Sequence, residues 1–476
     1  MPLIKSISGI RGTIGDVPGE NLTPADIERF TAAFASLLLE RSKKKKGIAS
    51  AKPRNVMVIG RDGRTSGEMV RGIVASTLTQ MGIDVIDLGL STTPTVEVAV
   101  KMEKAIGGII ITASHNPEEW NALKLLNKRG EFISAKRGAK VLQLAAKDDF
   151  AVRSAKKAGT LTLDDSYLQK HIDAILNYPL VNKEAIAKQE YKIVVDAVNS
   201  TGAIFVPALL KALGVNDVIL LNGEVTGKFA HNPEPLPENL TQLSNEVVKQ
   251  KAHLGIAVDP DVDRLCFVCE DGKMFGEEYT LVAVADYVLS KRKGNTVSNM
   301  SSTKSLKEVT LKHKGKYFPS AVGEVNVVKK MKEVKAVIGG EGNGGIIVPD
   351  LHYGRDALIG IGLFLTHLAE SGKTISGLRK QYPDYFISKN KIELVRKDSF
   401  GEKGVDVKPI FEKIKKKYKK NPINDEDGLK IEFDNDWVHL RTSNTEPIIR
   451  IYAESEFETT ANNIAQQLMR DIREFS

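Results

Sequence analysis

The chain has 476 residues, of which 42% are hydrophobic and 27% are charged, and its formal net charge is +8. At about 100 to 200 residues per domain this length excludes a single small module, and the composition excludes a disordered or fibrous chain. No apolar run approaches the roughly 20 residues of a membrane helix, and the opening MPLIKSISGIRG lacks the apolar core of a signal peptide, so we expect a cytoplasmic protein without membrane contact.

The first block of the chain alternates short β-rich runs with amphipathic stretches. This pattern predicts strands over 55–60, 83–88 and 106–112 and helices over 68–81 and 94–104. The third strand ends at TASHNP, which places Ser114 on a sharp, exposed loop where a nucleophile could act. A Ser114–His115 hydrolase site is disfavoured because no G-x-S-x-G elbow is present, and a capped turn without function remains an alternative.

The second block repeats the alternation, with strands predicted near 193, over 218–221 and over 254–258. Its last strand runs into DPDVDR, in which Asp259, Asp261 and Asp263 stand at every second position. Such carboxylates can converge on one hard cation, and ligation by oxygen alone favours magnesium or calcium over zinc. An EF-hand is rejected because Arg264 stands where the turn glycine is needed, whereas an acidic surface turn remains an alternative.

The third block predicts strands over 296–300 and near 337, and it ends in GEGNGG. This loop satisfies the letters of a dinucleotide fingerprint, but IIVP follows it instead of a helix, so we discard that interpretation. Glu341 and Asn343 would then offer acceptors and a donor to the vicinal hydroxyls of a sugar. A tight turn without function is the alternative.

The last hundred residues have a different pattern. Apolar and polar residues alternate from 428 to 454 around a turn at Asn435 and Asp436, which predicts antiparallel strands, and a closing amphipathic helix follows. The hairpin loop RTSNTEP offers hydroxyls, an amide, backbone N–H groups and a guanidinium. This is a phosphate-binding set, composed of Arg441, Ser443, Asn444 and Thr445.

These patterns predict an α/β protein with three related mixed α/β domains around a central cleft and a smaller C-terminal α+β domain. In open α/β sheets, ligands bind beyond the carboxyl ends of the strands, and the three strand-end loops would therefore face one cleft. We place the domains at residues 1–155, 156–271, 272–384 and 385–476.

The positive charge and the two cysteines require separate interpretation. Lysines cluster over 43–46, which we expect in a loop, and in KIKKKYKK from Lys413, which we expect on a helix. No nucleic-acid-binding motif accompanies them, so we favour a solvated basic face over a non-catalytic protein that binds nucleic acid or other anions. Excess positive charge does suit a cleft that attracts small anions. Cys266 and Cys269 are expected in the core of a strand.

In this order, TASHNP, DPDVDR, GEGNGG and RTSNTEP resemble the four signature loops of the α-D-phosphohexomutase superfamily, over essentially the whole chain. The resemblance implies that Ser114 is the phosphorylated serine and that Asp259, Asp261 and Asp263 bind Mg²⁺ together with it. It also assigns Glu341 and Asn343 to sugar binding, and Arg441, Ser443, Asn444 and Thr445 to phosphate binding. Arg11 in SGIRG and Lys124 in NALK match basic positions near the reacting phosphate, where His115 and Arg264 would add donors.

The implied reaction transfers the phosphoryl group of Ser114 to the free end of a sugar monophosphate. The resulting hexose 1,6-bisphosphate, which also serves as an activator, must turn end for end before it rephosphorylates the serine. A phosphoserine carries a charge of about −1.5 to −2, which explains the need for a divalent ion and cationic side chains. Closure of the fourth domain would exclude water.

Two positions depart from the usual pattern. Many relatives have Ser and His in the sugar loop where this chain has Asn343 and Gly345, so a general acid or base is missing there. Lys124 or Arg11 could replace it, and so could His352, although we favour a surface position for His352.

The sequence GEGNGG and the opening IKSISGIRGT are most similar to the phosphoglucosamine mutases of some bacteria and archaea. We therefore expect interconversion of glucosamine 6-phosphate and glucosamine 1-phosphate, which would supply UDP-N-acetylglucosamine synthesis. A phosphomannomutase/phosphoglucomutase of the same mechanism is the alternative, because no residue determines the substituent at C2. The oligomeric state cannot be predicted from the sequence.

Overall fold

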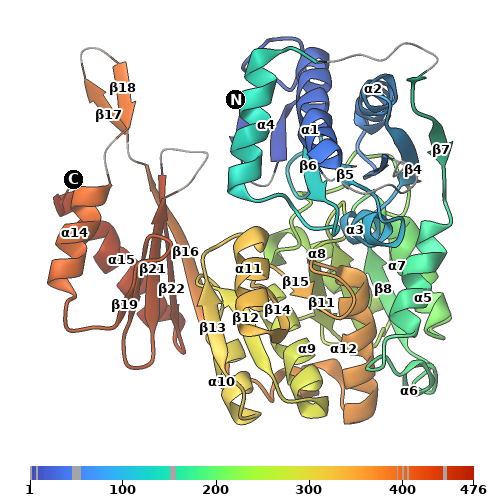
Figure 1. The fold of residues 1–476 in the computed structure, drawn as a ribbon. Coiled ribbons are helices and arrows are strands. Elements are labelled where there is room, and N and C mark those ends of the chain that lie inside the picture. Colours follow the sequence, from blue (N-terminus) through green and yellow to red (C-terminus); the bar gives the residue numbers. More distant parts are fainter. Residues whose placement is uncertain are drawn as a thin grey trace.

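Four β-sheets with their own helices follow one another along the chain (Figure 1). The computed structural model describes residues 3–6, 9–44, 55–150, 157–393, 395–398, 401–404, 407–442 and 448–475. Three sheets belong to mixed α/β units and the last is antiparallel, which confirms the predicted fold class. Within these residues no helix is both long and apolar enough to cross a membrane.

The first sheet has seven strands in the order β1-β2-β6-β5-β3-β4-β7. Helices cover both of its faces, so its central strands are apolar on both sides. The strands are β1 (Ile4–Ser6), β2 (Gly9–Thr13), β3 (Val56–Arg61), β4 (Asp84–Leu90), β5 (Gly107–Ile111), β6 (Trp120–Asn127) and β7 (Leu161–Leu163). The helices are α1 (Pro24–Lys44), α2 (Gly67–Gln80), α3 (Thr93–Met102) and α4 (Ala135–Lys147).

The second and third sheets have four strands each, in the orders β11-β10-β8-β9 and β13-β12-β14-β15. The second contains β8 (Lys192–Asp196), β9 (Asp217–Leu221), β10 (Leu254–Val258) and β11 (Leu265–Cys269), with helices α5 (Tyr167–Leu176), α6 (Lys183–Ala187), α7 (Gly202–Ala212) and α8 (Thr241–Lys249). The third contains β12 (Asn295–Asn299), β13 (Tyr317–Ser320), β14 (Ala336–Glu341) and β15 (Gly345–Ile347), with helices α9 (Glu277–Lys291), α10 (Ser305–Lys312), α11 (Glu324–Val334), α12 (Ala357–Ser371) and α13 (Ile375–Arg379). One continuous apolar core joins these two units.

The same strand arrangement recurs in all three α/β units. In each unit one strand pairs in parallel with two others, as β3 does with β4 and β5, β8 with β9 and β10, and β12 with β13 and β14. A further strand then pairs antiparallel with the last of these, giving β5–β6, β10–β11 and β14–β15. TASHNP, DPDVDR and the turn of GEGNGG therefore occupy equivalent positions between these last two strands.

The C-terminal sheet is antiparallel, in the order β16-β22-β21-β20-β19, and it packs against α14 (Lys408–Lys417) and α15 (Glu458–Phe475). Its strands are β16 (Phe386–Glu393), β19 (Ile423–Asn424), β20 (Leu429–Glu432), β21 (Trp437–Thr442) and β22 (Ile448–Ser455). A separate hairpin of β17 (Val395–Asp398) and β18 (Gly401–Gly404) projects from this unit (Figure 1).

Two groups of residues singled out in the sequence now have a structural context. Helix α1 continues through Lys44, so the first lysine cluster begins within a helix and not in a loop, while Lys45 and Lys46 lie outside the described residues. The second cluster is helical in part, because α14 ends at Lys417, where the ammonium pairs with Asp471 at 2.7 Å. Cys266 and Cys269 are buried in β11 as free thiols.

Candidate active site

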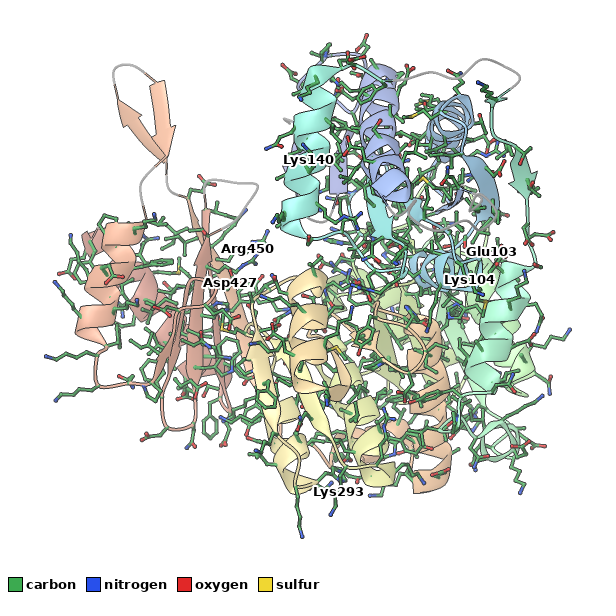
Figure 2. All side chains as sticks on the ribbon, in the orientation of Figure 1. Glu103, Lys104, Lys140, Lys293, Asp427 and Arg450 are labelled. Atoms are coloured by element: carbon green, nitrogen blue, oxygen red, sulfur yellow. The ribbon has the colours of Figure 1, made fainter. Side chains whose placement is uncertain are left out.

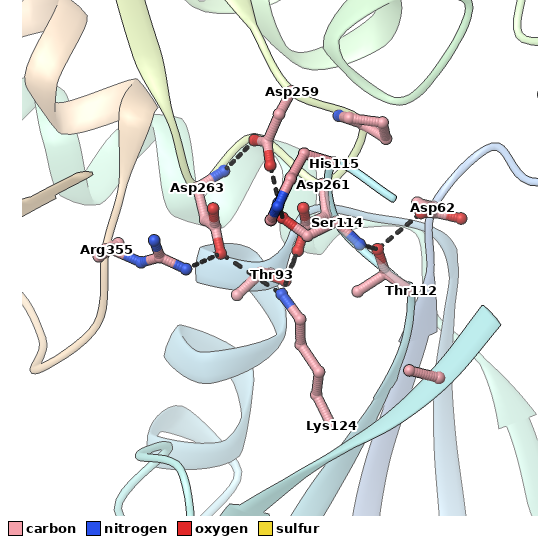
Figure 3. Close-up of polar contacts among 12 residues, drawn as sticks. Asp62, Thr93, Thr112, Ser114, His115, Lys124, Asp259, Asp261, Asp263 and Arg355 are labelled. Carbon is pink, nitrogen blue, oxygen red and sulfur yellow. Dashed lines mark hydrogen bonds and ion pairs between the residues drawn. The ribbon is translucent and has the colours of Figure 1, made fainter. Parts of the chain in front are cut away.

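The loop after β5 meets the loop after β10 at the boundary between the first two α/β units. Ser114 Oγ donates a hydrogen bond to Asp259 Oδ2 at 2.7 Å, although 145 positions separate the two residues (Figure 3). The contact removes most of the serine from solvent, and Ser114 is 7% exposed. The predicted exposed position of this serine is therefore wrong, because the aspartate loop covers it.

The three aspartates of the second loop form a buried group whose ligand atoms lie within 4.8 Å of one another. Asp259 Oδ1 accepts the N–H groups of Asp263 and Arg264 at 3.0 Å, which fixes the turn. Asp261 Oδ1 and Asp263 Oδ1 are buried and have no hydrogen-bond partner among the described residues. Burial and the two neighbouring carboxylates raise the pKa of Asp259 well above its usual range. A hard divalent cation fits this donor set, because it would satisfy both orphaned oxygens and offset the crowded negative charge.

Hydrogen bonds to Arg64 and Thr112 hold the backbone of Ser114 in a strained conformation. Ser114 has a φ of +51°, in the left-handed region that serine seldom adopts. Its N–H donates to Thr112 Oγ1 at 2.9 Å. Arg64, only 1% exposed, donates to Asp62 and to four carbonyl oxygens of this loop, those of Ser114, Asn116, Pro117 and Trp120. Arg64 is therefore the scaffold of the serine loop.

Lys124 lies on β6 and points at the aspartate group (Figure 3). Its ammonium donates to Asp261 Oδ2 at 2.6 Å and to Asp263 Oδ2 at 3.4 Å. Burial alone would lower the pKa of Lys124, but the two carboxylates outweigh it and raise that pKa. The lysine therefore stays charged. Thr93, at the start of α3, donates to the same oxygen of Asp261, so two elements of the first unit contact this carboxylate.

Arg355 joins the aspartate group to the hairpin of β14 and β15, whose turn is GEGNGG. This buried guanidinium contacts Asp263 Oδ2 at 2.7 Å, Glu324 Oε2 at 3.0 Å and Glu341 Oε2 at 3.2 Å. The other oxygen of Glu341 accepts from Asn299 and from the N–H of Gly323, both at 3.0 Å. Glu341 is thus 5% exposed and engaged on both oxygens. Asn343 is half-buried at the turn, where its Oδ1 accepts the N–H of Gly345 at 3.2 Å.

Arg355 also explains why a glycine stands at position 345. A Cβ added to Gly345 would lie 2.3 Å from Cδ of Arg355, which is far inside van der Waals contact. The arginine therefore fills the space that a side chain at position 345 would need. It brings a positive charge to this side of the site, but no group that exchanges protons near neutral pH.

A histidine lies next to Ser114, and an arginine lies next to that histidine. His115 Nδ1 lies 3.4 Å from Ser114 Oγ, and its Nε2 lies 3.4 Å from Nη2 of Arg264. Burial and the guanidiniums of Arg264, Arg355 and Arg11 lower the pKa of His115 well below its usual range, so the imidazole is neutral at pH 7. Arg264 also donates to Glu234 Oε1 at 2.5 Å.

The C-terminal unit contributes arginines to the same region. Arg441 on β21 and Arg450 on β22 are direct cross-strand partners, and Arg441 Nε lies 3.1 Å from Asp427 Oδ2. Arg450 and Asp427 lie on the side of this unit that faces the first and third units (Figure 2). Burial, Arg450 and Arg264 lower the pKa of Arg11, which shows that guanidiniums of three units act on one another. Ser443, Asn444 and Thr445 lie outside the described residues.

The expected surface position of His352 is wrong, because this side chain is buried and only 3% exposed. Its ring contacts Glu97 and Asp356 and not the serine loop, so it does not replace the missing acid or base directly. Sequence reasoning also missed Arg64, Thr93, Glu234, Glu324 and Arg355. Arg64 and Arg355 do carry a signal in the sequence, because each lies in a polar Gly-Arg segment, DGRT or YGRDA, next to a predicted strand or loop.

Comparison with known proteins identifies the family to which this chain belongs. Family models described as the α/β/α domains I, II and III and the C-terminal domain of phosphoglucomutase/phosphomannomutase match residues 4–152, 169–272, 276–385 and 401–471. The chain is 36% identical over 455 residues to a phosphoglucomutase/phosphomannomutase of Thermococcus kodakarensis, covering 95% of this chain and 94% of the relative. It is 32% identical over 469 residues to a probable phosphoglucosamine mutase of Methanopyrus kandleri, covering 98% and 97%.

Solved structures show the same fold. A phosphoglucomutase/phosphomannomutase family protein from Burkholderia thailandensis superimposes with a TM-score of 0.80 at 24% identity, covering 99% of this chain and 98% of that one. The protein is therefore a phosphohexomutase, an enzyme of the isomerase class. It belongs to the phosphoglucomutase/phosphomannomutase family, as the four signature loops predicted.

Proposed function

We propose that this enzyme is a phosphoglucosamine mutase that interconverts glucosamine 6-phosphate and glucosamine 1-phosphate through a phosphorylated Ser114 and a hexosamine 1,6-bisphosphate. The observation that carries the proposal is the 2.7 Å contact between Ser114 Oγ and a buried aspartate group with two unsatisfied carboxylate oxygens. Relatives named as phosphoglucosamine mutases, such as that of Methanopyrus kandleri, support the choice of substrate.

The residues around Ser114 suit phosphoryl transfer. Asp259, Asp261 and Asp263 would bind Mg²⁺, which would neutralise charge on the transferring phosphoryl group. His115, Arg264 and Arg11 would supply donors for its equatorial oxygens. In the forward half-reaction the sugar O1 forms a bond to phosphorus, the bond from phosphorus to Ser114 Oγ breaks, and the proton of the sugar hydroxyl ends on Ser114 Oγ, which becomes a hydroxyl again. The second half-reaction reverses these changes at O6.

A second anion site is needed for the phosphate that does not react. Arg441 and Arg450 are directly opposite each other on β21 and β22, and two guanidiniums on neighbouring strands suit the binding of one phosphate group. We assign the distal phosphate of the sugar to this pair, together with the RTSNTEP loop. Because either end of the substrate must fit either site, the bisphosphate can turn around and be used in both orientations.

Mass spectrometry and a serine variant test the mechanism. A fraction of the purified enzyme should be one phosphoryl group heavier, with the modification on Ser114, and Ser114→Ala should lose nearly all turnover. Ser301→Ala is a matched control, because Ser301 lies in the third unit and contacts His439. Turnover by Ser114→Ala at the wild-type rate would disprove the proposed mechanism.

Substrate specificity is tested by comparing kcat/KM for glucosamine, glucose and mannose 6-phosphates in the presence of Mg²⁺ and a priming hexose 1,6-bisphosphate. We expect glucosamine 6-phosphate to be preferred. A phosphoglucomutase/phosphomannomutase is the second candidate, favoured by the 36% identity to the Thermococcus kodakarensis enzyme of that name. Preference for glucose or mannose phosphate would select it. A phosphoglucosamine mutase would supply the sugar phosphate for UDP-N-acetylglucosamine synthesis.

A further inference from the structure

Four buried ionisable side chains meet where the three α/β units join, outside the phosphoryl site. Each unit contributes to this group through an element at its edge: α3 of the first, α5 of the second, and the loop before α12 of the third. All are at most 3% exposed, and they are Glu97, His171, His352 and Asp356. We call them the junction quartet.

The contacts of the junction quartet form a chain. Asp356 Oδ2 lies 3.0 Å from Nε2 of His171 and 3.0 Å from Nε2 of His352. Nδ1 of His171 lies 2.9 Å from Thr95 Oγ1, and Nδ1 of His352 lies 3.0 Å from Glu97 Oε2. The other oxygen of Asp356 accepts the N–H groups of Leu358 and Ile359 and so caps α12.

The donor and the acceptor in each of these contacts follow from which groups carry a proton. Asp356 accepts two backbone N–H groups at Oδ1 and faces both Nε2 atoms at Oδ2, so we assign it as a charged carboxylate to which both imidazoles donate through Nε2. The Nδ1 atom of His171 can then accept from the hydroxyl of Thr95. The Nδ1 atom of a neutral His352 is also an acceptor, and it faces a carboxylate oxygen. Nδ1 of His352 and both oxygens of Glu97 are buried without a hydrogen-bond partner among the described residues, so two acceptor atoms meet at 3.0 Å unless a proton lies between them.

The surroundings place that proton on Glu97. Both carboxylate oxygens of Glu97 are buried without a hydrogen-bond donor among the described residues, which disfavours a charged carboxylate there. Burial is also the largest cause that raises the pKa of Glu97 well above its usual range. The charged groups that face Glu97 are of both signs: Lys124 on β6, Asp263 after β10, and Arg355 and Asp356 before α12.

The junction quartet is connected to the active site at two points. Arg355 stands between His352 and Asp356 in the chain and contacts Asp263, so the segment that carries it is held at both ends by the quartet. Helix α3, which carries Glu97, begins at Thr93, which contacts Asp261. The same segment passes very close to Glu97, because a Cβ on Gly354 would lie 1.6 Å from Glu97 Oε2.

We propose that Glu97 is an uncharged carboxylic acid that donates a hydrogen bond to Nδ1 of His352, and that these two are positioning residues that hold Arg355 against Asp263. The effect on turnover rests on the function proposed above, whereas the protonation states do not. Neither side chain touches the reacting atoms; both act through the segment that carries Arg355.

Two variants of nearly equal size separate the roles of the donor and of the charge. Glu97→Gln keeps an N–H donor toward His352 and cannot ionise, so its kcat at pH 7 should stay within about twofold of wild type. Glu97→Met removes the donor, and its kcat should fall at least about tenfold with little change in KM, because Arg355 and not substrate binding is disturbed. Glu103→Met, an exposed carboxylate just beyond the same helix, is the control and should retain wild-type kcat.

The pH profile gives a readout that a merely structural role would not move. A carboxyl group whose pKa is raised by folding stabilises the fold at low pH, and that contribution disappears as the pH rises through the raised pKa. Wild-type turnover should therefore fall at alkaline pH as Glu97 ionises, and Glu97→Gln should retain turnover to higher pH. Equal losses in Glu97→Gln and Glu97→Met, or wild-type kcat in Glu97→Met, would overturn the proposal.

Nitrogen-15 NMR of the imidazole rings of the wild-type protein tests the proton positions without any assay of turnover. Two neutral rings protonated at Nε2 are expected for His171 and His352 at pH 7. An imidazolium signal from His352 would overturn the assignment. So would a tightly bound transition metal whose removal by a chelator shifts both rings, because His171, His352 and Asp356 also have the spacing of metal ligands. If the wild type turned over no hexose phosphate, the proposed function would fail while this measurement still decided the state of the quartet.

Discussion

At the scale of single residues, the site contains contacts in which the identity or conformation of one residue depends on its neighbour. Gly345 has no side chain because Arg355 occupies that space, and Arg355 in turn joins Asp263 to Glu341. Ser114 adopts a left-handed conformation because Arg64 and Thr112 hold its backbone on both sides. A change at either member of such a pair should therefore affect the chemistry at the other.

We predict that Gly345→Ala reduces kcat about tenfold or more. The new methyl group would meet Cδ of Arg355 at 2.3 Å, and the arginine cannot yield freely because three carboxylates hold its guanidinium. Steady-state kinetics measure the effect. Gly72→Ala in α2 is the matched control, since a Cβ there meets nothing within 4 Å, and it should leave kcat unchanged. Unchanged kinetics in Gly345→Ala would contradict the assignment of Arg355 to the site.

We predict that Arg64→Lys destabilises the fold by about 2 to 4 kcal/mol and slows phosphorylation of Ser114. A lysine cannot replace the planar set of donors that now reaches Asp62 and four carbonyl groups, and buried acceptors would be left unsatisfied. Urea unfolding measures the free energy. Arg61→Lys at the end of β3, three positions before Arg64, should cost less than about 0.5 kcal/mol, because its partner Glu68 has a side chain that is 66% exposed. Equal effects in the two variants would show that Arg64 is not a scaffold.

At the scale of elements, the repeated strand order determines where the loops lie. Each α/β unit ends its parallel strands at the same edge and then adds one antiparallel strand, so the chain must turn at that edge three times. The turns carry Ser114, the aspartates and Glu341. Helix α9 then supports the third turn from behind, because the carboxylate of Glu278 lies against Gly342 and accepts the N–H of Thr303 at 2.9 Å.

Glu278 should make stability depend on pH. Burial raises the pKa of Glu278 to about 8 from the ordinary value of 4.5, so the folded state retains a proton that the unfolded state loses. Stability should therefore fall as the pH rises from about 4.5 to about 8, by up to about 1.4 kcal/mol per pH unit from this group. Glu278→Gln should flatten that decline in urea unfolding measured at pH 5, 6.5 and 8. A decline as steep as in the wild type would refute the assignment.

At the scale of the whole molecule, the C-terminal unit is attached to the third unit and also reaches the first. Lys430 donates to the carbonyl of Met300 at 2.7 Å, and the N–H of Lys304 donates to Glu454 at 3.0 Å, which fixes the sheet beside α10. The charge of Arg450 also lowers the pKa of Arg11, although the two residues lie near opposite ends of the chain. An anion bound between these guanidiniums would draw the units together.

We predict that Arg450→Gln raises KM for the sugar phosphate about tenfold or more while Ser114 remains phosphorylated. The variant removes a cation from the proposed distal phosphate site, not from the reacting one, and the wild-type KM should rise more steeply with ionic strength than that of the variant. Lys416→Gln on α14 changes the net charge equally at an exposed position of the same unit and should leave KM unchanged. A similar KM for all three proteins would remove Arg450 from the substrate site.

Much of this organisation could be predicted because it is local along the chain. Short β-rich runs, mostly of continuous apolar residues, located most strands of the α/β units to within two residues, as at 254–258 and 218–221, and the fold class follows from their order. The polar loops are recognisable because an apolar strand that ends directly at carboxylates, hydroxyls or glycines is typical of a binding or catalytic loop. Strand β6 was not predicted, because the apolar and polar residues of WNALKLLN do not alternate strictly.

The sequence by itself determined the class of enzyme, through four loops whose residue types are sufficient for phosphoryl and sugar chemistry. Only the tertiary structure decided which residues meet. The burial of Ser114 under Asp259, the place of Arg355 beside Gly345, and the burial of His352 between Glu97 and Asp356 all depend on segments far apart in the chain. Periodicity reports the face on which a side chain lies, but the partner on that face depends on how the units pack, and no local pattern contains that information.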